Sequence, residues 1–100
     1  MAVTPQPAFT VDSSVGFAAG STTSNVALPG TLASDTVVRI TNMGPAHAAV
    51  ALGGSTVAAT NQNLVVRAGE TQYLGINSNT YLAAISIGMG DAILNIATGN

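Results

Sequence analysis

Turn-forming residues interrupt this chain of 100 residues so often that a long helix cannot form. Pro29-Gly30, Gly53-Gly54, Ala68-Gly69 and Gly88-Met89-Gly90 separate short segments that are rich in β-branched residues. None of these segments combines helix caps with apolar residues at the i, i+3, i+4 spacing of an amphipathic helix. Turns at intervals of about eight to twelve residues predict an all-β fold, either a β-sandwich or a small barrel, of seven or eight short antiparallel strands. We favour two packed sheets, because a single sheet leaves edges that associate.

The most regular stretch runs from Thr36 to Gly53, with the sequence TVVRITNMGPAHAAVALG. Larger apolar residues recur at every second position on both sides of Met43-Gly44-Pro45-Ala46, which predicts two strands joined by a turn there. In the first arm Val38 and Ile40 alternate with Val37, Arg39 and Thr41, and in the second Ala48, Val50 and Leu52 alternate with His47, Ala49 and Ala51. A final hairpin is predicted from Tyr81–Ile87 and Ala92–Thr98. Weaker strands are predicted at Phe9–Phe17, Asn25–Leu28, Ser55–Ala59, Leu64–Arg67 and Glu70–Ile76.

The chain is long enough for one domain, which we place at residues 9–100. Residues 1–8 contain Pro5 and Pro7 and no periodic pattern, so we interpret them as an extended N-terminal arm. Two interpretations of this arm stay open: a frayed terminus, or a segment that packs on a neighbouring subunit.

Charged residues make up 6% of the chain, against about 25% in an average globular protein. A protein with so few charges either buries much of its surface against partners or solvates that surface through Ser, Thr, Asn and Gln. Two arginines without a lysine cannot neutralise a row of phosphates, which argues against nucleic acid and against an anionic membrane as partners. The chain also has no apolar run of the ~20 residues that a membrane span needs, and its start lacks the features of a secretory signal.

No combination of residues in the sequence indicates catalysis or a bound cofactor. His47 is the single histidine and cysteine is absent, so a metal site lacks its usual ligands. No serine lies in a G-x-S-x-G elbow, and the aspartates occur at predicted strand ends, where they bond local backbone donors. We therefore expect a protein that is not an enzyme and that holds no cofactor or metal.

Two sets of residues are candidates for binding. The first set is charged: in so uncharged a chain, arginines and acids serve either an interface or an intramolecular surface pair. Its members are Arg39, Arg67, Glu70 and Asp35. The second set combines aromatic rings with amides, as a carbohydrate-binding surface does, although packing of the tyrosines in the core or at its rim is the better interpretation in a chain with 4% aromatic residues. Its members are Tyr73, Tyr81, Asn77 and Asn79.

Three stretches carry a resemblance to a known class: VVRITNMGPAHAAVALG, STVAATNQNLVVRAGETQYLGI and YLAAISIGMGDAILNIATG. In their succession of apolar strands, Gly turns and an Ala-Gly-Glu-Thr hinge, they resemble small structural proteins of tailed-phage virions, of the capsid decoration (cement) type. The resemblance implies a jelly-roll-like sandwich. It also implies a virion component that is made in the host cytoplasm, forms a homo-oligomer (a trimer or dimer) and clamps the major capsid protein or other virion proteins.

The first hypothesis is accordingly a non-enzymatic head decoration protein that acts through the area it buries. The alternative is a carbohydrate- or receptor-binding module of a fibre or adhesin. That alternative requires the tyrosines and amides of the second set to converge on one loop face.

Overall fold

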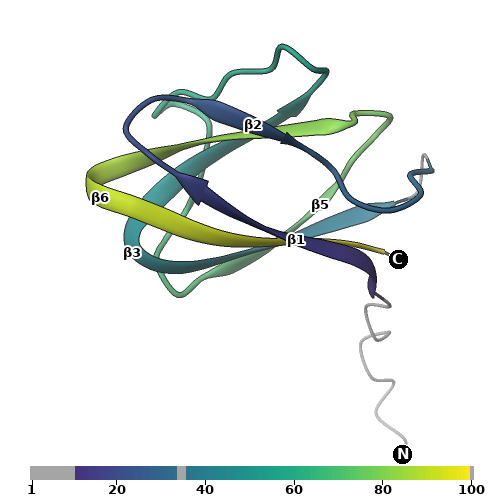
Figure 1. Ribbon diagram of the computed structural model, residues 1–100, viewed down its shortest axis with the longest axis horizontal. Coiled ribbons are helices and arrows are strands. Elements are labelled where there is room, and N and C mark those ends of the chain that lie inside the picture. Colours follow the sequence, from purple (N-terminus) through teal and green to yellow (C-terminus); the bar gives the residue numbers. More distant parts are fainter. Residues whose placement is uncertain (1–10, 34–35, 100) are drawn as a thin grey trace, which may run out of the picture.

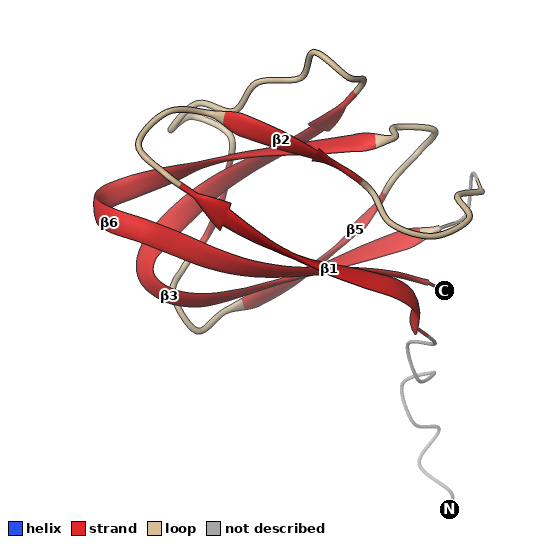
Figure 2. Ribbon diagram, in the orientation of Figure 1, coloured by secondary structure: helices blue, strands red, loops and turns tan. Residues whose placement is uncertain are grey.

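The computed structural model describes residues 11–33 and 36–99, and these residues form six β-strands and no helix (Figures 1 and 2). The strands are β1 (Val11–Ala19), β2 (Ser24–Ala27), β3 (Val37–Gly53), β4 (Leu64–Val66), β5 (Thr71–Gly75) and β6 (Tyr81–Gly99). The predicted N-terminal arm lies outside the described residues. None of the described residues belongs to a helix that could cross a membrane.

The two long strands, β3 and β6, form the centre of the fold. They pair antiparallel over their whole length, from Val37 opposite Gly99 to Gly53 opposite Tyr81. Both strands bend in the middle, where the ladder between them shifts register on either side of Pro45. The curl of both ribbons is visible at the left of Figure 1. The bend folds one continuous sheet back on itself, so that its two halves face each other across the core.

The short strands complete the two halves. In one half the order is β1-β6-β3-β5, and in the other it is β2-β6-β3-β4. Because β3 and β6 contribute a segment to both halves, each layer contains four antiparallel strands. Two four-stranded antiparallel layers connected in this way form a jelly-roll-like β-sandwich. The predicted fold class is therefore confirmed. The two layers contain eight strand segments, which belong to six strands because β3 and β6 each supply one segment to each layer.

Two predicted turns are bends inside single strands. Met43–Ala46 lies within β3, and Gly88–Asp91 lies within β6. The predicted final hairpin is thus wrong, because Tyr81–Ile87 and Ala92–Thr98 belong to opposite layers. Gly44 has φ 78° and Gly88 has φ 112°, backbone conformations that glycine adopts without a steric penalty. These glycines change the direction of each strand while pairing with the other long strand continues on both sides.

The predicted strand at Ser55–Ala59 is also wrong. These residues lie in the connection between β3 and β4. The other short strands occur where the sequence indicates them, with ends that differ by at most two residues. For example, β1 covers Val11–Ala19 where Phe9–Phe17 was predicted.

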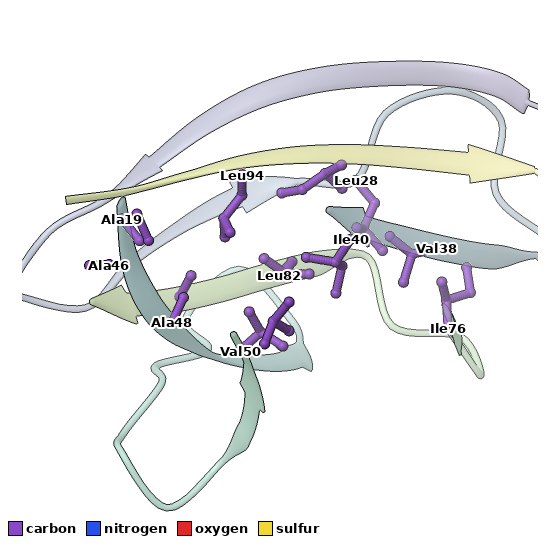
Figure 3. Close-up of a cluster of buried hydrophobic side chains, with 14 residues drawn as sticks. Ala19, Leu28, Val38, Ile40, Ala46, Ala48, Val50, Ile76, Leu82 and Leu94 are labelled. Carbon is purple, nitrogen blue, oxygen red and sulfur yellow. The ribbon is translucent and has the colours of Figure 1, made fainter. Parts of the chain in front are cut away.

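The core lies between the two layers and is built mainly from the long strands (Figure 3). Every even-numbered residue from Thr36 to Val50 is buried. The same face of β3 therefore points toward the core on both sides of the bend. On β6, Leu82, Leu94 and Ile96 are fully buried. The alternation seen in the central stretch of the sequence therefore belongs to one strand, β3, whose inward side chains line both halves of the core.

Candidate functional site

One outer face of the sandwich is nearly uncharged. It belongs to the layer β1-β6-β3-β5, and we call it the open face. The alternation of each strand directs the following residues outward: Ser14, Gly16 and Ala18 of β1; Ile93, Asn95 and Ala97 of β6; Val37, Arg39 and Thr41 of β3; Thr71, Tyr73 and Gly75 of β5. Of these residues Ala97 alone is fully buried. Arg39 carries the single charge of this set, and most of the others have small side chains. Small side chains allow another protein backbone to approach closely.

Arg39 and Tyr73 have the largest side chains on the open face. They are directly opposite each other in the β3–β5 ladder. Tyr73 is 54% exposed, whereas Arg39 is half-buried. In the next outward row, Thr41 and Thr71 bring their Oγ1 atoms within 3.2 Å. Tyr and Arg are enriched among the residues that dominate binding energy in protein interfaces, so this pair gives the open face an anchor.

The opposite outer face is covered by part of the chain itself. The connection from β3 to β4 passes β2, where Asn25 Nδ2 donates hydrogen bonds to the backbone oxygens of Ser55 (3.0 Å) and Val57 (3.2 Å). The N–H of Ala59 donates to Thr23 Oγ1 at 2.8 Å. In Figure 1 this connection is the teal loop above β2.

Burial on this covered face agrees with that path. Ala49 of β3 and Ala83 of β6 point outward, yet both are fully buried, and Ala59 of the connection is 3% exposed. To return from β2 to β4, the connection must cross β6 and β3. The sandwich therefore has one covered face and one open face.

His47, Arg67 and Glu70 lie close together at the bend of β3. The turn Arg67–Glu70 connects β4 to β5 and is closed by a hydrogen bond from Glu70 N–H to Arg67 O at 2.9 Å. Glu70 Oε1 accepts from the Arg67 N–H at 3.0 Å. His47 Nδ1 accepts from the Ala68 N–H at 2.9 Å. The imidazole and the carboxylate thus bind backbone donors of the same turn.

These contacts favour the ionised form of Glu70. The bond from the Arg67 N–H lowers the pKa of the Glu70 carboxyl below its ordinary value of 4.5, and a hydrogen bond with Gln72 acts in the same direction. Desolvation raises this pKa by less than either hydrogen bond lowers it, and the positive charge of Arg67 lowers it by a still smaller amount. The hydrogen bonds that Glu70 and His47 accept therefore stabilise the turn Arg67–Glu70.

Asn42 anchors the same corner from inside. It is fully buried, and its Nδ2 donates to Ala46 O (2.9 Å) and Val66 O (2.8 Å), while its Oδ1 accepts from Gly44 N–H (2.8 Å). Its backbone N–H donates to Glu70 O at 3.0 Å. Asn42 is absent from both sets of residues predicted from the sequence. The available indication was an amide at an inward position of the central stretch, two residues before Gly44-Pro45.

The structure divides the predicted charged set. It brings Arg67 and Glu70 together in one turn and places Arg39 on the open face, opposite Tyr73. Asp35 lies outside the described residues. His47, for which the sequence offers no fellow metal ligands, joins the turn of Arg67 and Glu70 through Ala68.

The predicted carbohydrate-binding set is spread over the molecule. Tyr73 points outward from the open face, whereas Tyr81 points outward from the opposite layer. Asn77 and Asn79 lie in the turn between β5 and β6, where Asn77 has φ 49° and Asn79 N–H donates to Ile76 O at 2.9 Å. The two rings therefore do not form one stacking platform.

Within residues 11–33 and 36–99, no group of three or more His, Cys, Asp or Glu side chains is placed to hold a metal ion. Comparison with known proteins found no matching family model, no matching curated protein and no matching solved structure.

Proposed function

We propose that this protein is a non-enzymatic structural component of a phage particle, a head decoration protein that binds the capsid surface through its open face. The observation that carries the proposal is the open face itself, a surface composed mostly of small residues with one charge and the Arg39–Tyr73 pair. Jelly-roll sandwiches are frequent among viral capsid proteins and also among lectins, so the fold adds an argument by analogy alone.

The mechanism is burial of surface area. Tyr73 supplies a large, rigid ring, and Arg39 supplies a guanidinium that can bond carbonyl or carboxylate groups of the capsid. Ser14, Gly16 and Ala18 are small and exposed, and they leave room for a facing backbone. With a single charge on the face, attraction between opposite charges contributes little, so we expect binding that changes weakly with salt concentration.

Co-sedimentation with capsids of the phage that encodes the chain tests this proposal. Wild-type protein is expected to pellet with capsids and to saturate at a fixed number of copies per capsid. Tyr73→Ala and Arg39→Ala are each expected to weaken binding by tenfold or more, by analogy with other interface anchors. Tyr81→Ala, on the other layer, is the matched control and is expected to bind like the wild type. A protein that never pellets with capsids, or a Tyr73→Ala variant that binds normally, contradicts the proposal.

The alternative class, a carbohydrate-binding module, makes a different prediction for the same variants. It requires binding to a glycan array that both Tyr73→Ala and Tyr81→Ala abolish. Because the two rings face opposite sides of the sandwich, one glycan cannot contact both of them in a single copy. We therefore favour the decoration protein.

A further inference from the structure

The sandwich has four edge strands, and they differ in how well they are protected. Sheet edges present unpaired N–H and C=O groups, and proteins protect them with short strands, covering loops, charges or proline. β4 has three residues and β5 has five. β2 has four residues, and its Asn25 is bonded to the connection that covers its face. β1 has nine residues and pairs with β6 on one side.

β1 lacks the usual deterrents to pairing. Its sequence, VDSSVGFAA, contains no proline and no lysine, and its single charge is Asp12 near one end. Asp12 Oδ2 accepts from the Thr31 N–H at 3.0 Å, which holds that carboxylate against the loop after β2. A register shift between Val11 and Ser13 perturbs the ladder at this end alone. The remainder of β1 is regular and uncharged.

Both sides of β1 suit a second strand of the same kind. Ser14, Gly16 and Ala18 point outward and are small, so a neighbouring sheet can continue the open face without steric conflict. Val15 and Phe17 point inward and pack against the core while remaining half-exposed. A partner strand with apolar inward residues would cover the exposed parts of Val15 and Phe17.

We propose that β1 pairs antiparallel with β1 of a second copy of this chain, around a two-fold axis at Val15. This register overlaps all nine residues, and it sets Ser14 opposite Gly16 of the partner subunit. It also sets Asp12 opposite an uncharged Ala18, whereas parallel pairing puts the two Asp12 carboxylates side by side. The product is one eight-stranded sheet that joins the open faces of two copies. This inference gives the self-association expected of a decoration protein a specific surface, but it requires no capsid.

A lysine placed on the edge tests the pairing. At Gly16 a Cβ atom meets no other atom within 4 Å, so Gly16→Lys is compatible with the fold. In the dimer it brings two ammonium groups close together, which is expected to weaken self-association by tenfold or more. Gly75→Lys on the edge strand β5 is the matched control, since a Cβ there is also unobstructed. The measurement is mass by light scattering over a range of concentrations.

The wild type and Gly75→Lys are expected at twice the 9.8 kDa chain mass, and Gly16→Lys is expected at 9.8 kDa with an unchanged melting temperature. A wild type that stays monomeric at every concentration, or a dimer that Gly16→Lys leaves intact, overturns the inference.

Cysteine cross-linking tests the register, because the chain contains no cysteine of its own. A mixture of Ser14→Cys and Gly16→Cys chains is expected to form a mixed disulfide under mild oxidation, since cross-strand neighbours lie within disulfide range. A mixture of Gly16→Cys and Ala18→Cys chains is the control and is expected to cross-link far less. Equal cross-linking in both mixtures contradicts the register. Neither result depends on capsid binding, so failure of the dimer and failure of the decoration function are distinguishable.

Discussion

The side-chain amide of Asn42 donates a hydrogen bond of 2.8 Å to the backbone oxygen of Val66, and this bond fixes the last residue of β4 to the bend of β3. Asn42 is fully buried and bonds Ala46 and Gly44 on either side of Pro45 as well. Buried polar groups are costly unless they are satisfied, and here one side chain satisfies three backbone groups. Asn42 therefore holds the point where the sheet folds into two layers.

Replacing Asn42 is expected to destabilise the protein strongly. Asn42→Ala leaves the oxygens of Ala46 and Val66 and the N–H of Gly44 without their partner, at a cost of about 3 kcal/mol. Urea unfolding measures the change. Asn61→Ala in the exposed turn after Thr60 is the control, with an expected change below about 0.5 kcal/mol. If both variants unfold at the same urea concentration, Asn42 does not have this role.

Gly30 is expected to tolerate no side chain. Its φ is 80°, and a Cβ atom there collides with Asp12 Oδ2 and approaches Thr98 Oγ1 to 3.2 Å. Gly30→Ala is therefore expected to cost at least about 1 kcal/mol, measured as a drop in melting temperature. Gly54→Ala, where a Cβ meets nothing within 4 Å and φ is not positive, is expected to be neutral or slightly stabilising. Equal melting temperatures for the two variants contradict this account of the loop after β2.

Stability is expected to depend on pH through Glu70. The pKa of Glu70 is lowered in the folded protein, first by the Arg67 N–H, so the folded state favours the ionised carboxylate. The stabilisation is present above the ordinary pKa of 4.5 and is lost as the pH falls through the lower folded value. The difference in melting temperature between the wild type and Glu70→Gln should be largest near neutral pH and should shrink toward pH ~3. A difference that does not change with pH refutes the carboxylate's role in the turn.

Asn25 is expected to control how firmly the covering connection is held. Asn25→Ala removes both hydrogen bonds to the oxygens of Ser55 and Val57. We expect faster amide hydrogen exchange across residues 54–60, with a much smaller effect on exchange in β3 and β6, because local opening does not require global unfolding. Asn25→Asp, which keeps the size but loses the donor, should behave like the alanine variant. Unchanged exchange in residues 54–60 shows that other contacts hold the connection.

The strand segments were predictable from the sequence, because alternation and turn residues are local properties. The connectivity of the bends was not. Gly44-Pro45 and Gly88-Met89-Gly90 have the composition of hairpin turns, and what makes them bends inside strands is pairing between β3 and β6, which are far apart in sequence. Ser55–Ala59 lies between two turn segments, Gly53-Gly54 and Thr60–Asn63, as a short strand would, yet it is held by Thr23 and Asn25 and has no ladder partner among the described strands.

The candidate site was predictable in part. Arg67 and Glu70 are three residues apart in one turn, so their contact follows from local geometry. The pairing of Arg39 with Tyr73 depends on the register of β3 against β5, and the separation of Tyr73 from Tyr81 depends on which layer each strand enters. Neither property can be derived from spacing in the sequence.

The position of β6 in the sheet also determines when this protein can fold during its synthesis. β6 is the last of the six strands in sequence, and it pairs with β1, β2 and β3. While the ribosome makes the chain, β3 can pair with β4 and β5, but β1 and β2 have no partner strand until β6 has been synthesised, and the residues of the later core stay exposed. Folding of this kind, through contacts between distant segments, is slow, and it exposes a nascent chain to aggregation. Both layers can close only after β6 has emerged.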